Sequence, residues 1–190
     1  MPYMKERSVL AVLVALCLVF PLSEPAGAET YELPYGFGLT LPEGWEVDTD
    51  EELSLFSAFH QEETFLGLSV IAAKDARNGA LGRFLNERTA RDPQKHDGEL
   101  FQFIITQYPH VARQLANKKV LAFTRAVGGK QAVCLTWFTL QEGAPIQIDM
   151  HCTPVGENIF VISTYYIVFY SKRCRALVDE VLQSCRFEAL

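Results

Sequence analysis

Four strand-like segments joined by short turns, between Lys118 and Tyr166, constrain the fold more than any other feature of this sequence. Gly128 and Gly129 separate the first two segments, and glycine readily takes the positive φ that a tight hairpin turn requires. The other two turns, at 142–145 and 154–157, are also rich in Gly and Pro. This spacing predicts an antiparallel meander with strands at Val120–Val127, Gln131–Leu140, Ile146–Thr153 and Ile159–Tyr166.

The second hairpin sets which residues lie opposite each other. With its loop centred on Gly143, the opposed pairs are Cys134 with Cys152, Leu135 with His151 and Trp137 with Asp149. Side chains alternate between the two faces of a strand. One face is therefore predicted to be apolar, and the other combines apolar with polar side chains: Val133, Leu135, Trp137, Gln147, Asp149 and His151. Both faces are apolar enough to be covered by other elements.

An apolar stripe with helical periodicity follows the meander. Residues 174, 177, 178, 181, 182 and 185 are all apolar, while charged side chains occupy the other side. The pattern predicts a helix at 171–184 that packs on one face of the sheet. We expect an α/β (α+β) fold in which a mainly antiparallel sheet of about six to seven strands lies between helices.

The segments before the meander supply the remaining elements. Alternating apolar residues predict strands at 37–41, 53–60 and 65–73, and Asn78 can cap a helix that runs to about Arg91. Glu99–Ala116 fits a helix or a buried strand, and Pro109 would kink or divide a helix there. We expect this segment to be helical and leave open whether it forms one helix or two elements.

The N-terminus has the three parts of an export signal. Lys5 and Arg7 are followed by an unbroken apolar run of twelve residues, Val9–Phe20, and by the small residues Ala26-Gly27-Ala28. Such a run is shorter than the roughly 20 residues that a membrane-spanning helix needs. We expect cleavage of a signal peptide at 1–28, which leaves 29–190 as one exported domain, periplasmic or extracellular. The alternative is an uncleaved anchor.

The overall charge argues against some partners. The formal net charge is −6 at pH 7, whereas nucleic acid binding requires a basic surface patch. The same charge disfavours an acidic membrane surface. We therefore predict an unknown protein or small-molecule partner, no nucleic acid, and no membrane insertion after signal cleavage.

Four cysteines remain after cleavage, an even number that favours disulfides in an exported chain. Cys134 and Cys152 are opposed in the predicted register, so we expect them to be adjacent in space and oxidised. Cys174 and Cys185 are separated by about 16 Å along one predicted helix and cannot pair while it stays helical. They are expected to be core thiols or to pair with the sheet cysteines.

Asp149 and His151 share a face of their predicted strand and are the best candidates for chemistry. Together they could form an acid–base pair or part of a metal site, but the sequence offers no third ligand nearby. It also contains no nucleophile–base motif, phosphate-binding loop or CxxC pair. A structural histidine is favoured at 151, and no catalytic residue, metal or cofactor is predicted. His60, His96 and His110 lie in or beside turns and are expected to be solvated.

Both ends of the exported part resemble a known family. Tyr35-Gly36-Phe37, the turn Leu41-Pro42-Glu43-Gly44-Trp45 and the closing Ser184-Cys185-Arg186-Phe187 are similar to segments of PsbP-like and Mog-like domains. The resemblance implies an antiparallel sheet between helices and a protein that binds or assembles other molecules. It implies no catalytic residue, because the family has no shared catalytic motif.

Two functional hypotheses follow. The first is a non-enzymatic exported binding or assembly protein with a site on the mixed face, around Trp137, Asp149 and His151. The second is a small hydrolase or metal-dependent enzyme that uses His151 with Asp149. A buried His151 with a backbone partner would favour the first, and an open cleft with a strongly shifted His151 pKa would favour the second.

Overall fold

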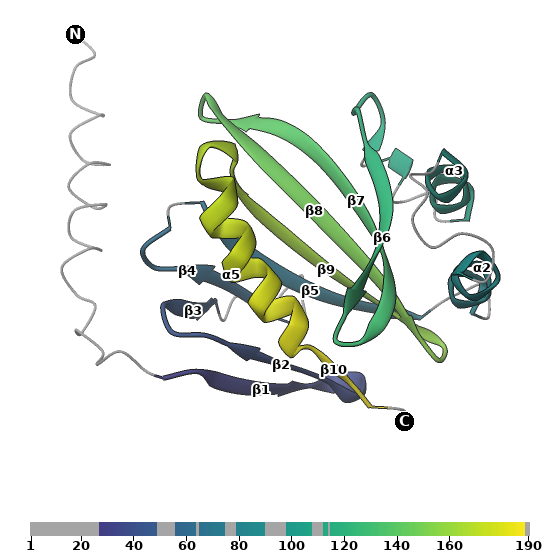
Figure 1. Cartoon of the computed structure of the whole chain (residues 1–190), viewed down its shortest axis with the longest axis horizontal. Coiled ribbons are helices and arrows are strands. Elements are labelled where there is room, and N and C mark those ends of the chain that lie inside the picture. Colours follow the sequence, from purple (N-terminus) through teal and green to yellow (C-terminus); the bar gives the residue numbers. More distant parts are fainter. Residues whose placement is uncertain are drawn as a thin grey trace, which may run out of the picture.

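The computed structural model describes residues 27–48, 56–63, 65–74, 79–89, 98–107, 112–113 and 115–188. Its main element is a seven-stranded sheet in the order β3-β4-β5-β9-β8-β7-β6, in which every neighbouring pair is antiparallel (Figure 1). The strands are β3 (Trp45–Asp48), β4 (Phe56–His60), β5 (Gly67–Lys74), β6 (Leu121–Val127), β7 (Lys130–Gln141), β8 (Ala144–Val155) and β9 (Asn158–Ile167). The predicted meander forms β6 to β9, and the predicted fold class is confirmed.

A three-stranded sheet brings the first and last described strands together. Its order is β1-β2-β10, with β1 (Glu29–Leu33), β2 (Phe37–Leu41) and β10 (Arg186–Phe187). The 3-10 turn η1 (Pro34–Gly36) connects β1 to β2. The sequence patterns do not predict β1, β3 or β10, since none of their residues is fully buried and their apolar alternation is weak.

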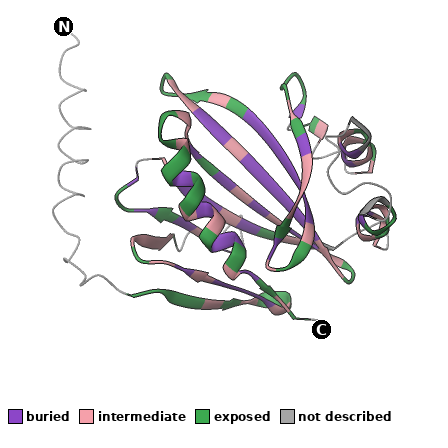
Figure 2. Ribbon diagram, in the orientation of Figure 1, coloured by how far each residue is buried: buried purple, intermediate pink, exposed green. Residues whose placement is uncertain are grey.

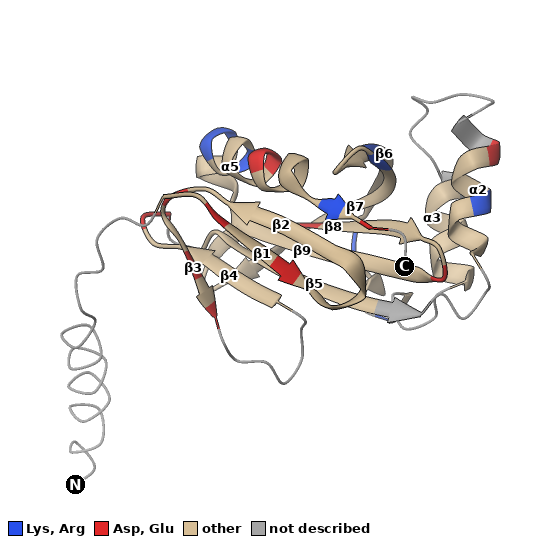
Figure 3. Cartoon of the chain, turned by 90° about the horizontal axis from the view of Figure 1, so that it is seen from below, with Lys and Arg blue, Asp and Glu red and all other residues tan. Residues whose placement is uncertain are grey.

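One face of the large sheet is covered by α5 (Ser171–Ser184) and by the small sheet (Figure 3). The predicted stripe of α5 is buried, through Cys174, Val178, Val181 and Leu182. These side chains join the buried residues of β2, β4, β5 and β9 in one apolar core. The Ser184 hydroxyl donates to the Thr40 carbonyl and accepts from the Thr40 N–H, both at 2.9 Å, which ties the end of α5 to β2.

The opposite face carries α2 (Ala80–Thr89) and α3 (Gly98–Gln107). Their buried side chains pack on β6 to β8 in a second apolar core, which includes Leu81, Leu85, Leu100 and Ile104. Because both faces are covered there, the central strands are buried along most of their length (Figure 2). Helix is confirmed for the described parts of 78–91 and 99–116, whereas Pro109 lies outside the described residues.

The predicted register of β7 and β8 is wrong by one residue. Glu142 and Gly143 alone form the turn, with positive φ values of 52° and 81°, and Gln141 pairs with Ala144. Positive φ at both central residues is the geometry of a two-residue primed hairpin turn. Pro145 was predicted to lie in the turn, but it pairs with Leu140 inside the ladder.

This shift moves the side chains of β8 to the other face relative to those of β7. Cys134 pairs with His151 and Val133 with Cys152, so the two cysteines point to opposite faces of the sheet and are not the opposed pair that was expected. Trp137 likewise pairs with Ile148 instead of Asp149.

Gly128→Ala should destabilise the protein more than Gly129→Ala does. Both glycines have positive φ, 52° and 74°, so each alanine carries a left-handed cost of about 1–2 kcal/mol. A Cβ on Gly128 would also lie 2.0 Å from the carbonyl oxygen of Cys185, whereas nothing lies within 4 Å of one on Gly129. We expect a further loss of about 2 kcal/mol in the free energy of unfolding at Gly128, measured by urea denaturation. Equal losses at both positions would contradict this contact between the hairpin and the end of α5.

Candidate functional site

A hollow of about 500 Å³ lies between α5 and strands β6 to β8. We call it the α5 cavity. Its apolar lining comes from Leu121, Phe123, Ala126, Phe138 and Val178, and its polar lining from Arg125, Thr136, Gln147, Asp149, Arg175 and Asp179. The volume falls in the range of small-molecule sites, which typically combine apolar walls with a few convergent polar groups.

The carboxylate of Asp149 is the centre of the polar lining. Asp149 is only 8% exposed, and three side chains donate hydrogen bonds to it. The Thr136 hydroxyl lies 2.6 Å from Oδ1, the Gln147 amide 3.0 Å from Oδ1 and 3.1 Å from Oδ2, and the Tyr166 hydroxyl 3.0 Å from Oδ2. Burial and the Asp149 charge raise the pKa of Tyr166, which keeps its hydroxyl a donor.

Two arginines complete this polar lining. The Nε of Arg175 donates to the Tyr166 hydroxyl and its Nη2 to the Gln147 carbonyl oxygen, both at 3.4 Å. Arg125 on β6 makes an ion pair with Asp179 on α5, at 2.9 Å between Nη2 and Oδ1. This ion pair connects the edge strand of the sheet to the helix across the cavity.

His151 lies on the same face of β8 as Asp149 but does not form a pair with it. The side chain is 0% exposed, and neither ring nitrogen has a hydrogen-bond partner in the described part of the chain. Burial, followed by the positive charge of Arg125, lowers the pKa of His151 to about 4, against the opposing effect of Asp149. The ring is therefore neutral at pH 7, and it is sealed from solvent.

Trp137 is separated from this face altogether. It belongs to the second apolar core, beneath α2 and α3, together with Leu135 and Met150. The structure thus brings Asp149 and His151 to one face, but Trp137 is not part of the same site. Sequence reasoning missed Thr136, Tyr166 and Arg175. A two-residue turn at Glu142-Gly143 would have placed Thr136 opposite Asp149.

The four cysteines of the described chain are free thiols, and all are buried. Cys134 lies across from His151 on the α5 face, while Cys152 belongs to the core beneath α2 and α3. Burial raises the pKa of the Cys134 thiol, and it raises those of Cys152 and Cys185 to about 12. Thiolates are scarce at such pKa values, which makes these groups unreactive at neutral pH.

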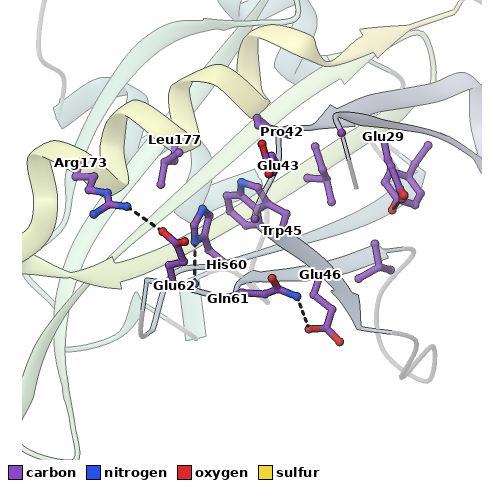
Figure 4. A pocket seen from close by; sticks show the side chains of 15 residues that line it. Glu29, Pro42, Glu43, Trp45, Glu46, His60, Gln61, Glu62, Arg173 and Leu177 are labelled. Carbon is purple, nitrogen blue, oxygen red and sulfur yellow. Dashed lines mark hydrogen bonds and ion pairs between the residues drawn. The ribbon is translucent and has the colours of Figure 1, made fainter. Parts of the chain in front are cut away.

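A second and larger hollow, of about 680 Å³, opens at the turn between β2 and β3 beside α5 (Figure 4). We call it the Trp45 pocket. Four glutamates line it, namely Glu29, Glu43, Glu46 and Glu62, with a single cation, Arg173. Arg173 is already bound, at 3.3 Å from Glu62 and 2.7 Å from Glu63. The lining is therefore acidic, in contrast to the α5 cavity with its two guanidinium groups.

His60 lies at the base of the Trp45 pocket and is 6% exposed, so the prediction that it is solvated was wrong. Its Nδ1 accepts from the backbone N–H groups of Glu62 and Glu63, at 3.3 Å each. Burial lowers the pKa of His60, against the opposing charges of the same two glutamates. The ring packs edge-on against Trp45, with 5.6 Å between the centroids, and helps to hold the β2–β3 turn. His96 and His110 lie outside the described residues.

No group of three or more His, Cys, Asp or Glu side chains in the described ranges is arranged to hold a metal ion.

Comparison with known proteins identifies the fold. No protein family model and no curated protein sequence matches this chain. Solved structures do match it, and they place it among proteins with a PsbP-like fold. The solution structure of cyanobacterial PsbP (CyanoP) from Synechocystis sp. PCC 6803 has a TM-score of 0.55 at 15% identity, over 89% of this chain and 97% of that one.

A crystal structure of a protein from Bacteroides thetaiotaomicron has a TM-score of 0.54 at 13% identity. The match covers 86% of this chain and 49% of the Bacteroides chain, so it extends over about half of that protein. At these identities the similarity shows a shared fold alone.

His151→Leu should make stability less sensitive to acid. The pKa of His151 is about 4 in the folded protein and near 6.5 in an unfolded chain. The unfolded state therefore binds a proton that the folded state does not, and stability should fall as the pH drops from about 6.5 toward 4. Leucine removes this dependence and also two unpartnered nitrogens, so stability at pH 7 should stay equal or rise by about 1 kcal/mol.

The measurement is urea denaturation of both proteins at pH 7 and pH 5. Groups common to both, including His60, contribute equally and cancel in the comparison. A loss between pH 7 and pH 5 that is as large in the variant as in the wild type would show that His151 is not held neutral by the fold.

Proposed function

We propose that this chain is an exported, non-enzymatic binding protein whose ligand is held in the α5 cavity. The observation that carries the proposal is the Asp149 network. A buried carboxylate with three protein donors is a rigid polar floor, and here it lies next to an apolar hollow of ligand size. Fully satisfied polar networks of this kind hold their members in one geometry, which suits recognition.

The same geometry argues against catalysis by His151 and Asp149. A general base must reach the proton that it removes, whereas His151 is enclosed and makes no hydrogen bond to Asp149 in the described structure. The oxygens of Asp149 are already taken by Thr136, Gln147 and Tyr166. A hydrolase using this pair is therefore the less favoured candidate.

Export is supported by the sequence and by where the first strand starts. Cleavage after Ala28 would leave Glu29, the first residue of β1, at the new N-terminus. In the described part of the chain, no helix combines the length and the apolar character needed to span a membrane. The PsbP-like fold is consistent with an accessory protein that binds other molecules.

Intact mass of the protein recovered from the envelope fraction should correspond to residues 29–190, and a full-length mass would contradict cleavage.

The mature protein should bind a neutral apolar dye such as Nile red in the α5 cavity. Phe138→Ser should weaken binding about tenfold, because it removes an apolar wall of the hollow. Leu140→Ser is the matched control: both residues belong to β7 and are exposed, at 53% and 74%, but only Phe138 lines the cavity. Binding is measured by fluorescence titration. Absence of dye binding, or equal effects of both variants, would contradict a binding function for this cavity.

A further inference from the structure

The walls of the α5 cavity require a ligand with an apolar body. Leu121 and Phe138 line it while 54% and 53% exposed, unusually high for large apolar side chains, and Phe123 and Val178 continue the same surface. A ligand that covers these side chains gains about 25 cal/mol for each Å² of apolar surface removed from water.

The neutral polar groups in the cavity and next to it are already used within the protein. The hydroxyls of Thr136 and Tyr166 both donate to Asp149. The amide of Gln147 donates to Asp149 and accepts from Arg175. These groups form the floor, and few of their hydrogen-bonding positions remain for a ligand.

The guanidinium groups are different, because they keep unused N–H donors. Arg175 makes two contacts with described residues, both long at 3.4 Å and neither to a carboxylate. Arg125 uses one Nη2 contact on Asp179, which lies one helical turn from Arg175 on α5. The unused donors of the cavity are therefore positively charged, and they suit an acceptor that carries negative charge. Asp179 lies beside them, but it is already paired with Arg125.

We infer that the α5 cavity binds an acidic amphiphile: an apolar chain or ring with a carboxylate or phosphate head, held by Arg175 and assisted by Arg125. The inference rests on the proposed function, since it names the class of ligand for the same cavity. A cationic head would meet two guanidinium groups, and a neutral hydroxyl would offer Arg175 no charged acceptor, although Asp149 and Asp179 lie close enough to act on its charge.

The test is calorimetric titration of the mature protein with four ligands that share one chain: octanoate, octyl phosphate, octanol and octylammonium. The two acidic ligands should bind about tenfold or more tightly than octanol, and octylammonium should bind least. The ratio of octanoate to octyl phosphate affinity tells which head the cavity prefers. Higher salt should weaken octanoate binding and leave octanol binding unchanged.

Arg175→Gln should reduce octanoate affinity to the level of octanol without changing octanol affinity. Arg173→Gln is the control, because Arg173 lies on the same turn of α5 but lines the Trp45 pocket. Equal binding of octanol and octanoate by the wild type would overturn the inference that the ligand has an acidic head. A preference for octanoate that survives Arg175→Gln would overturn the inference that Arg175 holds this head. Both results would leave the proposed binding function intact. If no octyl ligand binds and Nile red also fails to bind, the proposed function fails with it.

Discussion

The turn at Glu142-Gly143 fixes the register of β7 against β8, and the arrangement of both cores follows from that register. With Gln141 opposite Ala144, Thr136 lies opposite Asp149 and the polar side chains of β8 face α5. A shift by one residue would exchange the two faces of β8. Asp149 would then lie beneath α2 and α3, without its donors Thr136 and Tyr166. The conformation of two residues in a surface turn thus decides whether the Asp149 network can form at all.

That network has an energetic consequence for the α5 face. A buried carboxylate without partners costs several kcal/mol, and three donors offset this cost here. His151, two residues away on the same face, has no such compensation and is kept neutral by its surroundings. The same strand therefore carries one polar group that is fully satisfied and one that is tolerated only in its uncharged form.

The sequence predicted the elements better than their relations in space. Glycine at 128–129 and the stripe on α5 are local patterns, and they gave the meander, the helix and the fold class. The register depended on Glu142 taking positive φ, which is uncommon for a residue with a side chain. The site was therefore only half predicted: Asp149 was found, but Trp137 was assigned to the wrong face. Arg175 was not singled out, because a helical stripe does not tell which exposed residues border a hollow.

The meeting of β1, β2 and β10 in one sheet bears on the order of folding. β2 pairs with a strand only a few residues upstream and with β10, the last strand of the described chain, and Arg186 forms an ion pair with Glu32 at 2.7 Å. The small sheet is therefore complete only after β10 has been made, and the Ser184 contact that ties α5 to β2 also depends on this late part of the chain. Contacts between such distant segments form late, because long loops must close first. Until then β2 has a partner strand on one side only, and its other edge carries unpaired N–H and C=O groups that are open to pairing with another chain.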